Sequence, residues 1–491
     1  MFVPVILEFE NNGLKFMLLK YLRFLDLCMK NGWPIITHEE FDKYEINFPN
    51  RNEYNKEMVN RYGYSLYSYE ERKKVHHYFL PSGYYKEIEQ QKGSGLERAI
   101  YLINEQDDKL ENKFKEFLED ILIKEGNIEA VLYFASCPLS LKNICREMEI
   151  PMIAYETGPI RKSNYRCDTS YFCRNGLYDV SEIEKRWNAF YAISMENNKI
   201  QTFSREEILC MFLDKNSLGY LSQINRSPQY EAGIAGGHTL VVPYFAINKY
   251  MDHELIDEVF EIYDYSKVEV RLHPGDVYTA SYRLSKVDKA ESPFVFLINA
   301  KRICAVGSNM LFEAMMWKRI ACSKVKVMPA SIFCSTNYGE KHEKNNIELF
   351  VNFFIFSFLT PMELACDEEY IRWRLTNPTE DEIYNFNLNY YLKKFGLNIR
   401  WLSLDSNKRI EFLKMHRGFH PMTDDEFEKK LLIAMKGNNH SEENDDTCLE
   451  DENYYLKYIE TKEWLENVLN SSSWKITEPI RFIFDKMRRL K

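Results

Sequence analysis

Short apolar runs alternate with longer amphipathic stretches along the chain. This alternation is typical of α/β proteins, in which amphipathic helices connect buried parallel strands. In the first half, the pattern predicts strands at 3–9, 33–37, 130–136 and 152–155 and helices at 14–31, 107–124 and 139–148. Residues 50–92 have weak periodicity and many Tyr, Lys and Glu residues, so we expect a helical insertion over the first sheet there.

A second series of the same kind follows the stretch 222–238, which contains one proline and three glycines. Here the pattern predicts strands at 239–243, 268–272 and 303–306 and helices at 252–263 and 310–317. Two α/β units of similar size indicate two Rossmann-like domains that face each other across a cleft. We expect an N-terminal domain at 1–221, a linker at 222–238 and a C-terminal domain at 239–436.

The last part of the chain has a different composition. Residues 437–452 are polar and acidic, which is typical of a flexible linker. Residues 453–491 are predicted to form a helical tail, in which Trp474 and Ile480 lie close in sequence to Arg481 and Arg488. Such a tail could lie on an anionic membrane surface or pack as a plain C-terminal helix.

Composition and charge narrow the possible functions. Of the 491 residues, 45% are hydrophobic and 28% are charged, which is enough for large cores and unlike a disordered chain. The formal net charge of −10 argues against a surface that neutralises a nucleic-acid backbone. The eleven cysteines include no CxxC pair, so we expect reduced thiols and no structural zinc.

The N-terminal residues 1–9 lack a basic region and reach a carboxylate at Glu8, unlike a signal peptide. The most apolar stretch, 349–359, is interrupted by Asn352 and followed by Pro361, and is about half the ~20 residues that a membrane-spanning helix needs. We therefore expect a cytoplasmic protein without a transmembrane segment, which its tail could bring to the inner face of the membrane.

Three short motifs carry groups that could do chemistry, and each falls at the end of a predicted strand. The first is Glu156, followed by Gly158 and Arg161. A carboxylate in this position can act as a general base or nucleophile, and the arginine can pair with an anionic substrate. The alternative is a loop-capping glutamate beside a solvated arginine.

The second motif contains Arg271, His273 and Pro274. An imidazole held by the rigid proline can donate a hydrogen bond to a phosphate oxygen, although a histidine that only caps a turn is equally compatible.

The third motif contains Gly307, Ser308, Asn309 and Glu313. Its hydroxyl and backbone N–H groups could face an anion and its carboxylate could accept from ribose hydroxyls, or the serine could simply cap the helix.

Several other catalytic motifs are missing from the sequence. It contains no GxxxxGK[ST] loop and no GxSxG elbow, which argues against nucleoside triphosphatases and α/β-hydrolases. It also contains no Asp-x-Asp, so a metal-chelated nucleotide diphosphate is not indicated. We expect neither a metal nor a cofactor.

The order of these motifs resembles that of bacterial GT-B glycosyltransferases that use CMP-activated acid sugars. The nearest likeness is to the β-Kdo transferases of capsule and lipopolysaccharide assembly, and a more distant one is to bacterial sialyltransferases. The resemblance covers roughly residues 130–325. It implies that Glu156 is the catalytic carboxylate, that His273 with Pro274 and Ser308 contact the CMP phosphate, and that Glu313 contacts the ribose.

One position departs from the family pattern. Capsule Kdo transferases tend to carry an aspartate between the glutamate and glycine of the first motif, whereas this chain has Thr157. Glu156 therefore acts alone or with another acid, and Asp168 and Asp179 follow closely enough to assist. The sequence does not choose between retention and inversion at the anomeric carbon.

The resemblance implies transfer of Kdo from CMP-Kdo to a surface polysaccharide or lipopolysaccharide acceptor. The charge on a monophosphate leaving group could be met by His273 and Ser308 without a divalent ion. The carboxylate of the sugar would pair with Arg161, or else with Arg271. Two alternatives remain: a sialyltransferase or other GT-B enzyme with a different donor, and an inactive glycan-binding scaffold, which Thr157 favours.

Overall fold

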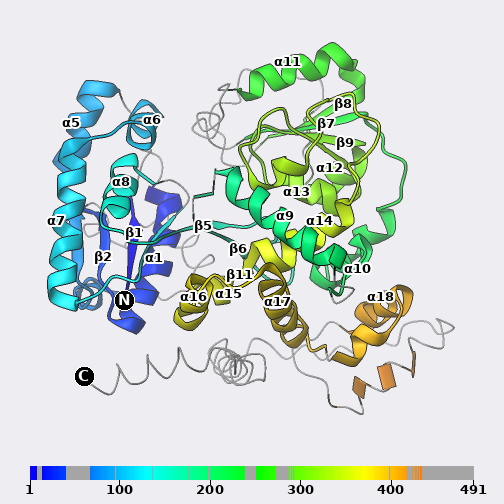
Figure 1. Ribbon diagram of the computed structural model, residues 1–491. Coiled ribbons are helices and arrows are strands. Elements are labelled where there is room, and N and C mark those ends of the chain that lie inside the picture. The colour runs from blue at the N-terminus through cyan, green and yellow to red at the C-terminus, as the bar shows by residue number, and fades with distance from the viewer. Residues whose placement is uncertain are drawn as a thin grey trace. The chain divides into compact units, whose positions relative to one another are not determined.

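A seven-stranded sheet organises the first half of the computed structural model (Figure 1). Its strands are β1 (Phe2–Ile6), β2 (Ile35–His38), β3 (His77–Leu80), β4 (Ala130–Phe134), β5 (Met152–Thr157), β6 (Thr169–Cys173) and β11 (Leu359–Pro361). Their order is β11-β6-β5-β4-β1-β2-β3, and β1 to β5 run parallel. β6 is antiparallel to both of its neighbours, β5 and β11. All residues of β1 and β4 are buried, which explains why these strands read as continuous apolar runs.

Helices cover this sheet. They are α1 (Leu14–Asn31), α4 (Tyr69–Arg72), α5 (Ser82–Lys92), α6 (Leu96–Asn104), α7 (Asp108–Glu125) and α8 (Leu139–Glu147). α1 packs against β1 and β2, while α8 packs against α6 and α7. α7 begins where the Asp107 side chain accepts from the N–H of Leu110, and ends at Gly126, whose φ of 81° is left-handed.

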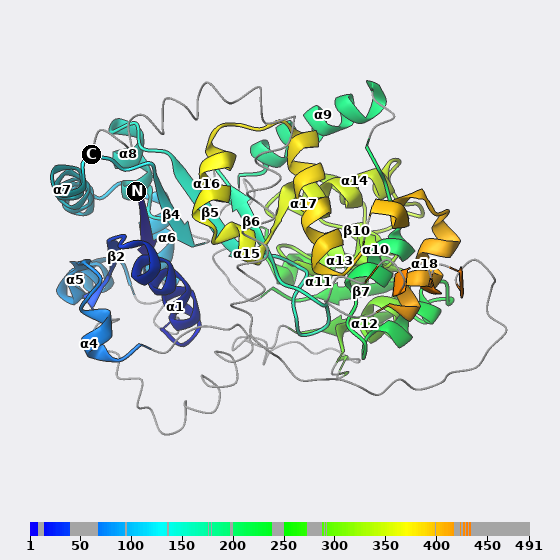
Figure 2. The same cartoon turned by 90° about the horizontal axis from the view of Figure 1, so that it is seen from below.

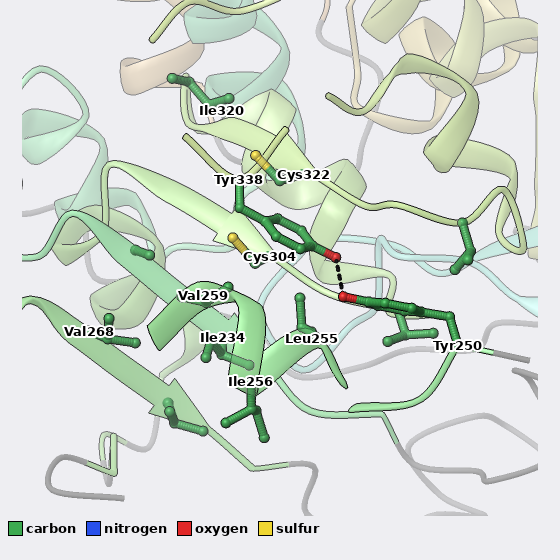
Figure 3. Packing of buried hydrophobic residues seen from close by; sticks show 14 of the residues in the cluster. Ile234, Tyr250, Leu255, Ile256, Val259, Val268, Cys304, Ile320, Cys322 and Tyr338 are labelled. Atoms are coloured by element: carbon green, nitrogen blue, oxygen red, sulfur yellow. Dashed lines mark hydrogen bonds between the residues drawn. The ribbon is translucent and has the colours of Figure 1, made fainter. Parts of the chain in front are cut away.

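A second, four-stranded sheet is entirely parallel. It consists of β7 (Ala232–Ala235), β8 (Val268–Arg271), β9 (Arg302–Cys304) and β10 (Ile320–Cys322), in the order β10-β9-β7-β8. The surrounding helices are α11 (Asp252–Ile262), α12 (Pro293–Asn299) and α13 (Met310–Met316), with 3₁₀ helices η1 (Leu218–Gln223), η3 (Tyr265–Lys267) and η5 (Pro329–Phe333). Figure 3 shows side chains of β7, β8 and α11 in one buried cluster, where the Tyr338 hydroxyl donates to that of Tyr250 at 3.3 Å.

The remaining helices pack on β6 and β11 or on one another. They are α9 (Val180–Glu196), α10 (Arg205–Phe212), α14 (Ile347–Phe353), α15 (Met362–Ala365), α16 (Glu368–Leu375), α17 (Glu380–Lys394) and α18 (Ser406–Met415), with the π-helical turn η6 (Phe354–Phe358) and the 3₁₀ helix η7 (Ile399–Ser403). α15 contacts β6 and β11, and α17 packs on the π-helical turn and α9 (Figure 2).

The predicted α/β class, with two Rossmann-like sheets, is confirmed. Three segments differ from the predicted domain plan. β3 lies inside the predicted insertion at 50–92, β7 lies inside the predicted linker at 222–238, and β11 returns from the predicted C-terminal domain to the first sheet. β7 looked like a linker because it contains Gly233, yet this glycine is required by packing: a Cβ there would lie 2.8 Å from the Phe296 ring.

The apolar stretch at 349–359 forms most of α14, the π-helical turn and the start of β11, and it is buried from Phe350 onward. Asn352, which interrupts it, accepts from the N–H of Phe203 at 2.8 Å and donates to its carbonyl at 2.7 Å. In the part of the chain that the structure describes, no helix is both long and apolar enough to cross a membrane.

The structure describes residues 1–433, except 8–13, 40–66, 94–95, 135–136, 175, 178, 197–199, 238–249, 273–286, 289, 291, 398, 417–422, 424–425, 428 and 431. The predicted strand at 239–243, the acidic linker at 437–452 and the tail at 453–491 lie outside these residues. Within them, the cysteines are free thiols, and all except Cys366 are buried.

Candidate functional site

The first motif lies on the hairpin formed by β5 and β6. β5 continues two residues beyond the predicted strand, so that Glu156 pairs with Tyr171 of β6 and Thr157 pairs with Ser170. Glu156 is half-buried, and its Oε1 accepts a hydrogen bond of 2.7 Å from the N–H of Thr157. This places the carboxylate at the C-terminal edge of the parallel strands, where open α/β sheets bind their ligands.

Gly158 shapes the turn that follows. Its N–H donates to the carbonyl of Thr169 at 2.8 Å, which brings the two ends of the hairpin loop together. A Cβ at this position would lie 2.3 Å from Oγ1 of Thr169. Arg161 folds back over the same turn, where its Nε donates to the carbonyl of Gly158 at 2.9 Å. The turn therefore fixes the relative positions of Glu156 and Arg161.

We expect Gly158→Ala to lower the free energy of unfolding by about 1–3 kcal/mol, because the methyl group can fit only if Thr169 and the hairpin loop move. Urea unfolding followed by fluorescence would measure the loss. Gly219→Ala is the matched control, because nothing lies within 4 Å of a Cβ there. Equal stability of the two variants would show that the turn tolerates a side chain.

The third motif lies at the C-terminal edge of the second sheet. The strand order reverses between β7 and β9, and the crevice at such a reversal is the usual ligand site of an open parallel sheet. Gly307, Ser308 and Asn309 begin three residues after the end of β9 at Cys304 and are half-buried. The Ser308 hydroxyl accepts from the N–H of Met310 at 3.2 Å, but the N-cap position of α13 is Asn309, whose side chain makes no capping hydrogen bond. His273 and Pro274 lie outside the described residues.

Two tyrosine hydroxyls join the hairpin to this third motif. Tyr171, the strand partner of Glu156, donates to Oδ1 of Asn309 at 2.7 Å. Tyr165, in the hairpin loop, donates to Oε1 of Glu313 at 2.8 Å. The structure thus brings the first and third motifs together, although they are more than a hundred residues apart in sequence.

Glu313 has an unusual environment for a carboxylate. Burial raises its pKa to about 7, although the Tyr165 hydrogen bond and the charges of Arg161 and Arg271 act in the opposite direction. The two arginines of the first and second motifs therefore lie near this carboxylate. Arg271 is also engaged elsewhere, because it forms an ion pair with Asp288 and donates to the carbonyl of Ala290 at 2.9 Å.

Asp168, a predicted assisting acid, is buried on the α15 and α17 side of the hairpin. Its Oδ1 accepts from the N–H of Lys162 at 2.8 Å. Burial raises its pKa, and the nearby Glu363, which pairs with Lys394, raises it further. Asp179, the other candidate, accepts from the N–H of Ser181 next to the start of α9. Both carboxylates therefore make local structural contacts.

Sequence reasoning missed Tyr165 and Tyr171. The sequence signal was only a general richness in aromatic residues, which indicates core packing as readily as a site. Tyr171 could have been found only from the register of an antiparallel strand after β5, which the pattern did not predict.

One hollow of this fold lies away from this edge of the sheets, and no metal cluster lies among the described residues. Among the described residues, no three His, Cys, Asp or Glu side chains come together as metal ligands would. A cavity of about 350 Å³ lies at the start of β10, on the opposite edge of the second sheet, and contains no predicted site residue. Its lining includes Met315, Arg319, Ile320, Phe333, Lys344 and Ile347.

Residues 7–182 match the Glycosyltransferase 99 family N-terminal domain. This range includes the β5–β6 hairpin with Glu156, and it confirms the predicted resemblance to glycosyltransferases. A comparison with curated protein sequences finds no match.

Solved structures with detectable similarity include two β-Kdo transferases. The KpsC β-Kdo 2,7 transferase of Thermosulfurimonas dismutans has 12% identity and a TM-score of 0.34, over 50% of this chain and 82% of that chain. The KpsC β-Kdo 2,4 transferase of the same organism has 15% identity and a TM-score of 0.27, over 46% and 79%. The UDP-GlcNAc 2-epimerase of Methanocaldococcus jannaschii has 14% identity and a TM-score of 0.28, over 68% and 86%.

Proposed function

We propose that this chain, a glycosyltransferase by its family match, transfers Kdo from CMP-Kdo to a surface polysaccharide or lipopolysaccharide acceptor. The observation that carries the proposal is the meeting of the Glu156 hairpin with Asn309 and Glu313 through two tyrosine hydrogen bonds. This arrangement joins a half-buried carboxylate to the edge of a second parallel sheet, where a nucleotide can bind.

In this proposal the second sheet binds the donor. Gly307, Ser308 and Asn309 follow β9 beside the reversal of strand order, and His273 with Pro274 follows β8. Hydroxyl, imidazole and backbone N–H donors would stabilise the charge that develops on the CMP phosphate as it leaves. Glu313 would accept from the ribose.

The carboxylate of the sugar needs a cation near the reacting carbon, and the contacts favour Arg161 over Arg271. Arg271 already pairs with Asp288, whereas the hydrogen bonds of Arg161 go to the carbonyl oxygens of Gly158 and Thr157. A guanidinium held by neutral carbonyls keeps its charge for a ligand.

Glu156 is the proposed catalytic carboxylate. As a nucleophile, it would bond to the anomeric carbon as CMP leaves. The oxygen of the acceptor hydroxyl would then displace the carboxylate with retention and give up its proton to the released phosphate or to water. As a base, it would take the proton of the acceptor hydroxyl in a single inverting step. The acceptor would approach from the first sheet. The strand order of this sheet reverses between β1 and β4, beside β5, and such a reversal is the usual ligand site of an open α/β sheet.

The test is CMP release from the purified chain supplied with CMP-Kdo or CMP-sialic acid, with a crude lipopolysaccharide or capsule acceptor. Acceptor-dependent release from CMP-Kdo alone is the expected result. Turnover of CMP-sialic acid, or of a UDP- or GDP-sugar control, would leave the proposed glycosyltransferase activity in place but would reject CMP-Kdo as the donor. If no donor is turned over but the protein still binds the glycan, the result would favour the inactive scaffold that Thr157 suggests.

We expect His273→Ala to weaken CMP binding about tenfold, because the variant loses a hydrogen bond to an ionised phosphate. Calorimetry with CMP measures the dissociation constant directly. His342→Ala removes an exposed imidazole elsewhere and serves as the control. An unchanged dissociation constant for His273→Ala would remove this residue from the donor site.

The proposal also places the protein in the cytoplasm, where nucleotide sugars are made, with contact between the tail at 453–491 and the membrane surface as an added feature. Sedimentation with anionic vesicles, with and without this tail, would test the contact. Loss of co-sedimentation on truncation is the expected result.

A further inference from the structure

The hydrogen bond between Tyr165 and Glu313 is buried. Tyr165 is 2% exposed and Glu313 is 7% exposed, and the two side chains come from the hairpin loop and from α13. The bond engages Oε1 of the carboxylate. Among the described residues, no hydrogen bond engages Oε2. A buried carboxylate with one oxygen held and the other unused is a ready acceptor for a ligand hydroxyl.

The packing of the Tyr165 ring does not by itself require a hydroxyl. The ring lies edge-on to Phe294 with 5.5 Å between the centroids, a geometry that a phenylalanine would also adopt. A hydroxyl buried at this point needs a partner, and Glu313 supplies it. The polar part of the tyrosine therefore serves the carboxylate rather than the core.

Among the residues that the structure describes, three charged or titratable groups act on Glu313: the Tyr165 hydroxyl and Arg161 from the hairpin loop, and Arg271 from the end of β8. Each of them favours the ionised carboxylate, and burial opposes them. Tyr165 is the one that forms a direct hydrogen bond, so it also fixes the orientation of the carboxylate.

We propose that Tyr165 is a positioning residue of the nucleotide-sugar site: its hydroxyl holds Oε1 of Glu313 so that Oε2 is presented to a ribose hydroxyl of the donor. This inference rests on the function proposed above. It assigns Tyr165 no contact with the donor and no part in bond making. Tyr171 is a second bridge between the hairpin and the third motif, and it donates to the neutral amide of Asn309.

This arrangement links nucleotide binding to the release of a proton. Near neutral pH part of the Glu313 population is protonated, since its pKa is about 7. A ribose hydroxyl that donates to the carboxylate favours the ionised form, so binding releases a fraction of a proton to the buffer. Loss of the Tyr165 hydroxyl would raise the pKa of Glu313 further and make the released fraction larger.

The experiment is calorimetry of the full chain with CMP at neutral pH, in buffers that differ in ionisation enthalpy, which yields the number of protons released. We expect Tyr165→Phe to release more protons than the wild type and to bind CMP about three- to tenfold more weakly. Across pH, its acid-side loss of affinity should shift upward by about half a pH unit to one unit. Ionisation of CMP itself is common to all variants and cancels in the comparison.

Two further variants complete the design. Tyr171→Phe loses a bridging hydroxyl but should keep the proton release of the wild type, because Asn309 does not titrate. Glu313→Gln should lose the part of the release that the wild type owes to this carboxylate, and it remains informative if Tyr165→Phe fails to fold. Equal proton release in the wild type and Glu313→Gln would overturn the inference.

Other results would also decide the matter. Unchanged proton release in a folded Tyr165→Phe, or tighter CMP binding, would overturn the positioning role while leaving the proposed function standing. Failure of the wild type to bind CMP would overturn the proposed donor and this inference together. The two failures are therefore distinguishable.

Discussion

Glu156→Gln is expected to lower glycosyl transfer by about a thousandfold or more, to background, while CMP binding stays nearly unchanged. An amide can neither bond to the anomeric carbon as a carboxylate does nor take a proton from the acceptor. The substitution keeps the shape of the side chain, and the amide oxygen can still accept from the N–H of Thr157. Acceptor-dependent CMP release and calorimetry with CMP measure the two effects separately.

Glu147→Gln is the matched control for this variant. Glu147 is an exposed glutamate of α8 that pairs with Lys115 at 2.7 Å, so its substitution should leave both turnover and CMP binding unchanged. A Glu156→Gln protein that retains more than a few per cent of wild-type turnover would remove Glu156 from the chemistry. The search would then return to the other acids of the hairpin loop.

Much of the fold could be predicted from hydrophobic periodicity. The pattern located β1, β4 and β5 because their residues are mostly buried apolar side chains in a parallel sheet, which leaves little ambiguity. It also located α1 and α7, whose amphipathic runs are long enough to rule out strands. The two-sheet plan followed from these elements and from their repetition in the second half.

The pattern failed where packing overrode local signals. β7 contains a glycine because the Phe296 ring leaves no room for a side chain, and a glycine reads locally as a loop. β11 is three residues long and ends in Pro361, so nothing in its own sequence indicates a strand that joins a sheet far away in the chain. Such contacts depend on the whole fold.

The residues of the candidate site also differ in whether the sequence could predict them. Glu156 and Ser308 could be found because they lie at or just after the C-terminal ends of strands that the pattern located to within two residues. Tyr165 could not be found, because its role depends on a contact with Glu313 across 148 residues of sequence. Asp168 was placed near Glu156 by proximity in sequence, but a hairpin turns successive residues toward different neighbours, and its carboxylate lies with Lys162 and Glu363 instead.

The largest expected effect on stability comes from Glu380→Gln, which removes one charge of a buried ion pair between α9 and α17. Arg186 of α9 and Glu380 of α17 form two hydrogen bonds, Nε to Oε1 at 2.7 Å and Nη2 to Oε2 at 3.1 Å. Each side chain is only 10% exposed. Glu380 outweighs the effect of burial and keeps the pKa of Arg186 above its usual range. The amide would remove the hydrogen-bonded counter-charge of this buried guanidinium and leave Glu182 as a nearby negative charge. The expected loss is about 3–5 kcal/mol in the free energy of unfolding.

The substitution should also weaken CMP binding at the candidate site, because the ion pair supports the strand that carries Tyr171. The Arg186 guanidinium lies 5.0 Å from the centre of the Phe358 ring, and that ring lies edge-on to Tyr171 with 6.1 Å between the centroids. Tyr171 in turn donates to Asn309. Urea unfolding measures the loss of stability, and CMP titration of the folded variant measures how far the disturbance travels.

Glu184→Gln provides the comparison, since it makes the same chemical change on α9 in an exposed pair with Lys326 and should cost no more than about half a kcal/mol. If Glu380→Gln were no less stable than Glu184→Gln, the Arg186 guanidinium must find water or another acceptor when its partner is neutral. The double variant Arg186→Met, Glu380→Gln separates these cases. It should recover most of the lost stability only if an uncompensated buried charge is the cause.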